Sequence, residues 1–272
     1  MATIIIQRLD GTVYDLDAMG FRVKKFDIPL PNYNHSYQQI GNYGSTLIGT
    51  QAQQLVIPLV IDITAMDIHD YNFQLLQLRR VFRSDEDFFV INMYAPFIRW
   101  RCRAEAVTPS QNGNFWRASD VTINLDCPSG FAESVATTQD PVDPPNNGWG
   151  FGQGFNTEQI PSYIYTTADF TFFNAGVIPL RADDRPVKIT FQGTAPNGFT
   201  LTNNTTKQSF KLTKGVRSSD VVTILGFVPS INGKQEYSSS DHGFLDFAVG
   251  ENKLHLDGAS GFTMKFDTRF YY

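Results

Sequence analysis

The chain has 272 residues, of which 42% are hydrophobic and 18% are charged, and its formal net charge is -5. This composition excludes a disordered chain, and the acidic balance argues against a dedicated nucleic-acid binder, which usually carries a basic excess. The length allows two ordinary domains, and the 23 Phe and 11 Tyr residues favour a β fold, because aromatic side chains fill half-buried sheet faces well.

The N-terminal segment predicts a β-hairpin. Residues 4–9 form a candidate strand, and Asp10-Gly11 predicts a two-residue turn into a strand at residues 13–16. The apolar run Ile4-Ile5-Ile6 is too short for a secretory signal and lacks a basic leader, so we expect synthesis in a cytosol. No segment approaches the roughly 20 apolar residues of a membrane helix.

Further strands are expected in the first half of the chain, at residues 21–30, 54–64, 88–94, 100–107 and 115–125. Residues 54–64 alternate well between apolar and other positions, and Pro58, which cannot donate to a sheet, predicts an edge or a bulge there. Residues 32–50 are polar and rich in Tyr and Gly, and we expect them to form a loop that contacts a neighbouring protein; a mobile surface loop is the alternative.

One helix is predicted at residues 67–83. Asp67 caps its start, and the arginines in its last turn suit the carbonyl end of the helix dipole. The apolar positions recur at helical spacing and predict a core stripe, made of Tyr71, Leu75, Leu78 and Phe82. Strands, one helix and further strands together predict an α+β domain.

A Pro/Gly-rich segment separates this half from the next. Residues 129–162 contain Pro144-Pro145 and a glycine-alternating run at 148–154, which predicts an interdomain linker pinned by Trp149, Phe151 and Phe155. The run lacks the Lys-Ser/Thr of a phosphate-binding loop. The predicted division is therefore a first domain at 1–128, a linker at 129–162 and a second domain at 163–272.

The second domain shows many short β segments separated by turn residues, which predicts a β-sandwich. The expected strands are residues 170–173, 187–193, 199–202, 208–212, 221–225, 244–248, 252–256 and 262–266. The fold class predicted for the whole chain is mainly β.

Candidate chemical sites are few, and we predict no catalytic, cofactor-binding or metal-binding residues. The acidic clusters 85–87 and Asp183-Asp184 fall in expected turns, where solvated charge is the usual explanation. The histidines do not have metal-ligand spacing to one another or to cysteine; they are His35, His69, His242 and His255. Cys102 and Cys127 are expected to be buried thiols, with a single bridge between them left open.

The chain resembles the distal tail protein family of bacteriophages with long, non-contractile tails. In the first module the likeness is carried by residues 5–11 (IIQRLDG), 14–16, 20–23 and the helix before 87–91 (DFFVI). In the second it is carried by 173–176 (FNAG), 187–193 (VKITFQG) and the ending from 250–254 (GENKL) through 264–266 to 269–272 (RFYY).

The resemblance implies a belt domain that closes into a hexameric ring, single or back to back, and a galectin-like β-sandwich that projects from it. Such a ring would sit in the virion at the tail tip or baseplate, between the major tail protein and the tail-associated lysin or tail-tip protein. Receptor-binding proteins are often held at its rim, and DNA passes through its channel. No enzyme activity, cofactor or membrane contact is implied. Strands 54–64 and 88–94 are expected to contribute to the ring.

Two other function classes compete with this one. A carbohydrate-binding sandwich would need an aromatic platform, and Trp100, Trp116 and Trp149 all precede the predicted sandwich, although Tyr or Phe can substitute for Trp. A hydrolytic enzyme would depend on carboxylates such as Asp183 and Asp184.

Overall fold

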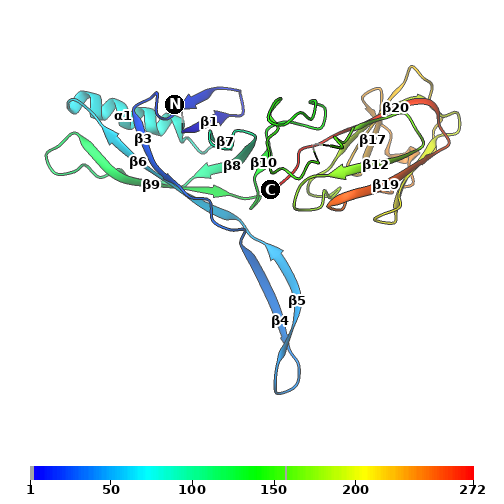
Figure 1. Cartoon of the computed structure of the whole chain (residues 1–272), viewed down its shortest axis with the longest axis horizontal. Coiled ribbons are helices and arrows are strands. Elements are labelled where there is room, and N and C mark those ends of the chain that lie inside the picture. Colours follow the sequence, from blue (N-terminus) through cyan, green and yellow to red (C-terminus); the bar gives the residue numbers. More distant parts are fainter. Residues whose placement is uncertain (1–2, 157) are drawn as a thin grey trace. The chain divides into compact units, whose positions relative to one another are not determined.

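A computed structural model describes residues 3–156 and 158–272. Three residues lie outside the described residues: Met1 and Ala2, at the start where no secretory signal is expected, and Thr157, in the predicted linker. The chain folds into two compact units, Met1–Glu133 and Ser134–Tyr272. In both units the regular secondary structure is mostly β-strand, so the predicted mainly β fold class is confirmed (Figure 1).

Unit 1 contains an antiparallel sheet with the strand order β2-β1-β7-β8-β9-β6-β3. The bounds of its strands are β1 (Ile4–Arg8), β2 (Val13–Asp15), β3 (Phe21–Phe26), β6 (Leu55–Thr64), β7 (Phe88–Asn92), β8 (Ile98–Ala104) and β9 (Arg117–Cys127). Side chains from β1 and from the distant strand β6 share one core, so the sheet curls around it. The two-residue strand β10 (Glu133–Ser134) lies at the boundary of the two units.

Alternation along β6 explains its place in this core. Leu55, Ile57, Leu59, Ile61 and Ile63 are all 0–3% exposed, as a period-two strand requires when one face is buried. Pro58 stands opposite Asn124 of β9, but the pairing of β6 with β3 ends at Leu59. One side of Pro58 is therefore an unpaired edge, where its missing N–H costs no ladder bond.

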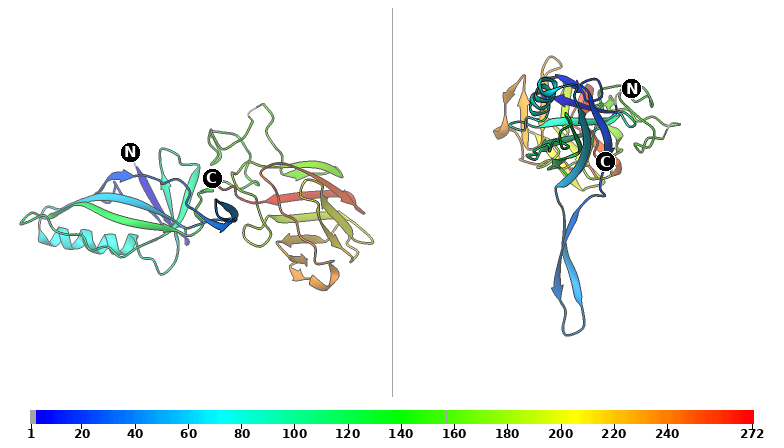
Figure 2. Two further views of the ribbon diagram at one scale, coloured as in Figure 1. Left: turned by 90° about the horizontal axis from the view of Figure 1, so that it is seen from below. Right: turned by 90° about the vertical axis from the view of Figure 1, so that its left-hand side faces the viewer.

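The predicted helix forms as α1 (Ile68–Val81), the one α-helix of the described residues. The Asp67 carboxylate accepts a hydrogen bond from the backbone N–H of Asp70 at 2.8 Å, so the expected cap is confirmed. Tyr71 and Leu78 are buried, and Leu75 and Phe82 are partly buried against the same core. The helix covers the core of the curled sheet (Figure 2).

Two local predictions for unit 1 are wrong in detail. The first hairpin pairs Gln7 with Val13 and bonds the N–H of Arg8 to the carbonyl of Thr12, so its loop has three residues instead of two. Only Gly11 takes positive φ, at 88°, which suits the longer loop. Residues 32–50 are not a loop: they contain strands β4 (Tyr33–Gln39) and β5 (Ser45–Ala52), which form a separate hairpin.

Unit 2 is a sandwich of two antiparallel sheets with the orders β11-β20-β13-β16-β17-β18 and β12-β19-β14-β15. The strands are β11 (Ile164–Tyr165), β12 (Asp169–Asn174), β13 (Lys188–Thr194), β14 (Phe199–Asn203), β15 (Gln208–Leu212), β16 (Val221–Leu225), β17 (Val228–Ile231), β18 (Lys234–Gln235), β19 (Gly250–Asp257) and β20 (Ser260–Asp267). Phe191 and Phe266 from one sheet and Phe172 and Leu254 from the other share one core.

The strand predicted at residues 244–248 is absent. Phe247 makes only an isolated bridge to Leu180, because the amides on either side of it bond to side chains and not to a strand: Asp246 N–H donates to Gln208 and Ala248 N–H donates to Asn252. Strands β11, β17 and β18 were not predicted, since each has only two to four residues.

Most of the predicted linker belongs to unit 2. Trp149 is 1% exposed, and its ring lies 5.0 Å from that of Phe155 and 6.1 Å from that of Phe270. Phe151, the third expected anchor, is 66% exposed. The Pro/Gly-rich segment has no core of its own, as its composition indicates, but it adds a large aromatic side chain to the core of the sandwich.

Candidate functional site

The most exposed ordered feature of unit 1 is the hairpin formed by β4 and β5. Figure 1 and the right-hand view of Figure 2 show this hairpin along its full length, extending away from the sheet. Every residue of both strands is exposed. An isolated two-stranded ribbon is at best marginally stable in water, so this exposed hairpin is a candidate contact surface.

The two faces of this hairpin differ in chemistry. Alternate residues of a strand point to one face, and Tyr33, His35 and Tyr37 therefore form a row along β4, with ring centroids 6.5 and 6.3 Å apart. Leu47 stands opposite Tyr37 across the hairpin, next to a bulge at Ile48. The intervening residues Asn34, Ser36 and Gln38 are polar. We call the side with Tyr33, His35, Tyr37 and Leu47 the aromatic face.

The tip of the hairpin is also apolar. Tyr43 is 100% exposed and Ile40 is 61% exposed. The amide of Ile40 donates to the carbonyl of Gly44 at 2.8 Å, which closes the turn. Gly41 takes φ of 56°, a left-handed conformation that glycine adopts without the strain of a side chain.

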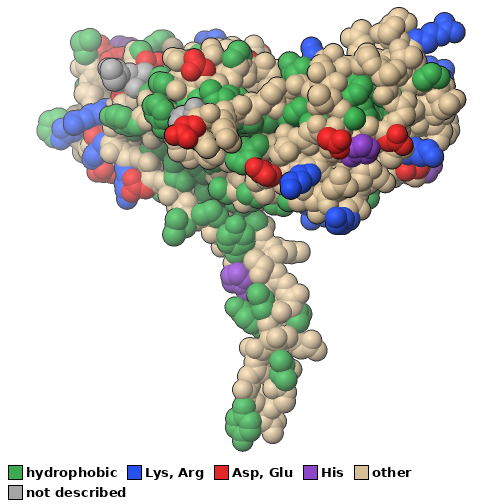
Figure 3. Space-filling view, turned by 45° about the vertical axis from the view of Figure 1, so that its right-hand side comes forward, with side chains coloured by type: hydrophobic (Ala, Val, Ile, Leu, Met, Phe, Trp, Pro, Cys, Tyr) green, Lys and Arg blue, Asp and Glu red, His purple; other side chains and the backbone are tan. Residues whose placement is uncertain are grey.

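No Asp, Glu, Lys or Arg occurs between Asp27 and Asp62. The space-filling view shows hydrophobic side chains and one histidine on the hairpin, without acidic or basic groups (Figure 3). Free sheet edges usually carry charges or Pro that prevent pairing with other chains. Both edges of this ribbon lack such protection, so their backbone groups are open to hydrogen bonding.

A second apolar surface lies beside α1. A groove of about 370 Å³ runs between the second half of the helix and the segment that follows β8, with the apolar side chains of Leu75, Leu78, Phe82, Val107 and Ile123 among its lining. Arg79 and Glu105 also line it. Its size is in the range of sites that hold a ligand or a few side chains of a partner.

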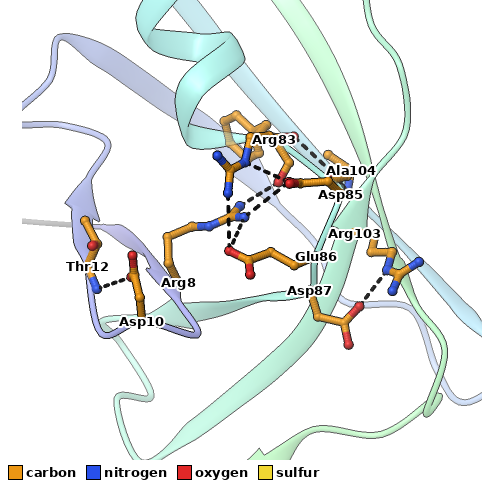
Figure 4. A network of polar contacts seen from close by, with 11 residues as sticks. Arg8, Asp10, Thr12, Arg83, Asp85, Glu86, Asp87, Arg103 and Ala104 are labelled. Carbon is orange, nitrogen blue, oxygen red and sulfur yellow. Dashed lines mark hydrogen bonds and ion pairs between the residues drawn. The ribbon is translucent and has the colours of Figure 1, made fainter.

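The acidic cluster 85–87 lies in the turn that follows α1, as expected, and Asp85 is exposed there, but the three carboxylates also take part in an ion-pair network (Figure 4). Arg8 is 5% exposed; it donates to Glu86 at 2.8 Å and to the carbonyl oxygen of Arg83 at 2.6 Å. Arg83 in turn contacts Asp85 at 2.7 Å. The guanidinium of Arg8 thus ties β1 to the turn that follows α1.

Asp87 forms the other half of this network. It accepts hydrogen bonds from Arg101 at 2.7 Å and from Arg103 at 2.5 Å. Partial burial acts to raise the pKa of Asp87, but these bonds outweigh it and hold the pKa below its ordinary value. Each carboxylate is held by arginine, so the arrangement suits a structural role.

The other candidate residues are not gathered into one site. Asp183 pairs with Arg181 and Asp184 with Arg185, so each carboxylate faces a cation and not a second carboxylate across a cleft. His255 contacts Asp169 at 2.7 Å, and His35 contacts Thr50 at 2.9 Å. Within the described ranges, no three His, Cys, Asp or Glu side chains lie close enough to hold a metal ion.

The aromatic platform expected of a sugar site is not supplied by tryptophan. Trp149 belongs to the sandwich unit, contrary to the prediction that all three tryptophans precede it, but it is buried. Exposed ring pairs do occur in this unit: Phe227 with Phe244, and Tyr237 with His242 at 4.2 Å. Across residues 3–156 and 158–272, no helix has the length and apolar character needed to cross a membrane.

Comparison with known proteins gives one family model for part of the chain and several solved structures of similar fold. Residues 9–127 match the family described as phage tail protein RIFT-related domain. The chain is similar in structure to the Dit protein of phage SPP1, described as a paradigm of the hub adsorption apparatus in phages that infect Gram-positive bacteria. The TM-score is 0.71, the identity is 14%, and the match covers 98% of this chain and 99% of that one.

Two structures of the phage p2 baseplate in its activated conformation, with Sr and with Ca, also match. The TM-score is 0.50 for both, with identities of 10% and 9%; the matches cover 97% and 98% of this chain and 97% of each matched chain. No curated protein sequence matches the chain.

Proposed function

We propose that the chain is a phage tail protein of the RIFT-related kind that residues 9–127 match, and more finely that it is a distal tail protein that closes into a hexameric ring. The ring connects the tail tube to the tail-tip or lysin protein and to receptor-binding proteins, and it leaves a channel for DNA. The observation that carries this proposal is the uncharged, fully exposed hairpin β4–β5, together with a fold that the Dit protein of phage SPP1 shares along nearly its whole length.

The hairpin is the proposed joint between neighbouring subunits. Its aromatic face and tip offer apolar area that nothing in unit 1 covers, and its edges offer unpaired backbone groups. A surface that binds a different surface on an identical copy makes a head-to-tail contact, and such contacts close into rings when the rotation permits.

The groove beside α1 is the proposed receiving surface on the next copy. Its apolar lining matches the hairpin tip, and neither Ile40 nor Tyr43 would bring a charge that must be desolvated there. A second copy of the chain is therefore the partner that these two surfaces fit. The expected role of strands 54–64 and 88–94 is to support this arrangement as the core of unit 1.

Light scattering coupled to gel filtration, with negative-stain microscopy, tests the ring. We expect a sixfold annulus at high protein concentration. Tyr37→Glu places a charge on the aromatic face and should abolish the annulus, whereas Gln38→Glu places the same charge on the opposite face of the same strand and should weaken it much less. Because both residues are exposed, neither variant should change the melting temperature of the monomer appreciably.

Val107→Glu tests the groove, since this side chain is 38% exposed and lines it. Loss of assembly with a folded monomer supports the groove as the receiving surface. If Tyr37→Glu forms normal rings, the hairpin is not the joint between subunits. If Val107→Glu forms normal rings, the groove beside α1 is not the surface that receives the hairpin.

A sugar-binding role for the sandwich is the second candidate, favoured only by the exposed pairs Phe227–Phe244 and Tyr237–His242. A glycan array with the full chain tests it. Specific binding that is lost in Tyr237→Ala supports adhesion to a host surface, and absence of binding leaves the connector as the function of the chain.

A further inference from the structure

Two cysteine thiols lie at the centre of the unit 1 sheet and have no part in the proposed ring. Cys102 and Cys127 are both free and both 0% exposed. Their sequence separation did not indicate whether they meet. Buried free cysteines are common as small apolar side chains, so burial alone assigns them no role.

The strand register brings the two cysteines together. Arg103 of β8 pairs with Asp126 of β9, and Ala104 pairs with Leu125. Extending this antiparallel register by one residue sets Cys102 directly opposite Cys127.

The outer neighbours of the two cysteines complete a row across four strands. Phe88 of β7 pairs with Cys102, and Leu55 of β6 pairs with Cys127. Directly opposite residues point to the same side of a sheet, and all four side chains of this row are buried in one core. Both thiols therefore project into the same space.

This placement has the geometry of a cross-strand disulfide. Directly opposite residues of antiparallel strands have Cα atoms about 4.5 or 5.5 Å apart, and disulfides bridge Cα separations of roughly 4.4–6.8 Å. Cys127 Sγ also lies 3.5 Å from the hydroxyl oxygen of Ser129. A hydrogen bond from the Cys102 thiol lowers the pKa of Cys127 to about 7, and the same contact raises the pKa of Cys102. Cys127 is accordingly the better nucleophile.

We propose that Cys102 and Cys127 are an oxidative modification site, at which a small-molecule disulfide such as oxidised glutathione converts the two thiols into a β8–β9 cross-link. The Cys127 thiolate attacks one sulfur of glutathione disulfide, whose S–S bond breaks and releases one glutathione thiolate. Cys102 loses its proton to solvent and attacks the Cys127 sulfur, which releases the second. The protein loses two electrons and two protons, and the small disulfide is reduced to two thiols.

The cross-link strengthens a weak position in the sheet. Besides the cysteine pair, β8 and β9 share the register pairs Arg103–Asp126 and Ala104–Leu125, and the ladder continues for one bond, from the amide of Glu105 to the carbonyl of Asn124. A covalent bond here closes a loop of about 25 residues, which restricts the unfolded chain. Cytosolic thiols are kept reduced whereas extracellular ones oxidise, so the bond would form after the chain leaves the cell in which it was made.

Incubation of the full chain with oxidised glutathione, well below its melting temperature, tests the site. Because neither sulfur is exposed, reaction must wait for local opening of the sheet and should be slower than in the denatured chain. We expect an intact mass lower by two hydrogen atoms, without a glutathione adduct. A peptide map should join the Cys102 peptide to the Cys127 peptide. The melting temperature of unit 1 should rise by about 10 °C and return on addition of dithiothreitol.

The single variants Cys102→Ser and Cys127→Ser provide matched controls, because each keeps one thiol and cannot form the bond. Neither should show the rise in melting temperature. If a variant does not fold, the peptide map of the unmodified sequence still decides. Both thiols remaining free in the folded chain, after an incubation many times longer than the denatured chain needs to react fully, would overturn the proposal. So would stable single adducts of glutathione, or bonds only between chains.

Discussion

Substitution of Leu78 by Ala tests how α1 is held on the sheet. Leu78 is 5% exposed, so the change removes three carbon atoms from the core. At about 0.8 kcal/mol for each buried carbon group the transfer term is about 2.4 kcal/mol, and the cavity left behind adds to it. Because the site adjoins the groove, solvent can enter part of the space, and we expect a total loss of about 3 kcal/mol.

Leu76→Ala is the matched control, since it makes the same substitution two residues away on the same helix. Leu76 is 60% exposed, so its truncation should cost about 0.5 kcal/mol. Leu75, which is partly buried beside the groove, should fall between the two. The difference in stability loss between Leu78→Ala and Leu76→Ala depends only on which side of α1 faces the sheet.

Urea unfolding followed by circular dichroism at the helix band measures the difference, because α1 is the one α-helix of the described residues and lies in unit 1. With a slope of about 2 kcal/mol per M urea, Leu78→Ala should lower the midpoint by about 1.5 M. Equal losses for Leu76→Ala and Leu78→Ala would refute the orientation of the helix and with it the argument from spacing.

Three other changes should have measurable effects. Asp87→Asn should cost roughly 1–2 kcal/mol at neutral pH. The pKa of Asp87 is depressed in the folded chain, so this stability is fully present above the unfolded value near 3.9 and is lost as pH falls through the folded pKa. Acid titrations of the two forms should therefore converge once the pH lies below the folded pKa of Asp87. Trp149→Ala should destabilise unit 2 by about 3–5 kcal/mol in thermal unfolding, whereas no effect would mean that the segment is a free tether. Asp67→Ala should cost about 1 kcal/mol in the same urea assay, and an unchanged midpoint would show that the cap contributes nothing.

Local pattern predicted the elements whose side chains meet the core in a regular period. The alternation in β6 and the helical spacing of Tyr71 and Leu78 were both sufficient, because the period of apolar residues depends on backbone geometry alone. Asp67 was found for a similar reason, since a capping side chain bonds a backbone group only three residues away. The mainly β class followed from the same short-range signals.

The hairpin β4–β5 was missed because it has no buried face. Its Asn, Gln and Gly residues are typical of a loop. Because both faces of the hairpin are exposed, the alternation of Tyr33 and Tyr37 with polar residues does not mark a buried face. The Tyr and Gly content of residues 32–50 predicts a contact region but not its structure. That it is a ribbon with one apolar face emerged only from the pairing of the strands.

The ion pairs between distant residues were also beyond the sequence. Arg8 and Glu86 are 78 positions apart, and only the pairing of β1 with β7 brings them to 2.8 Å. The same holds for Trp149, whose Pro/Gly-rich surroundings indicate an extended segment but not the neighbour against which it packs.

Composition and short-range periodicity determined by themselves that this chain is built of strands with one capped helix, because those preferences act over a few residues. Which distant strands lie next to each other was decided only by the tertiary structure, because that choice depends on how both units enclose their cores. The facing of Cys102 and Cys127 across β8 and β9 and the lack of any cover on β4 and β5 both follow from that packing.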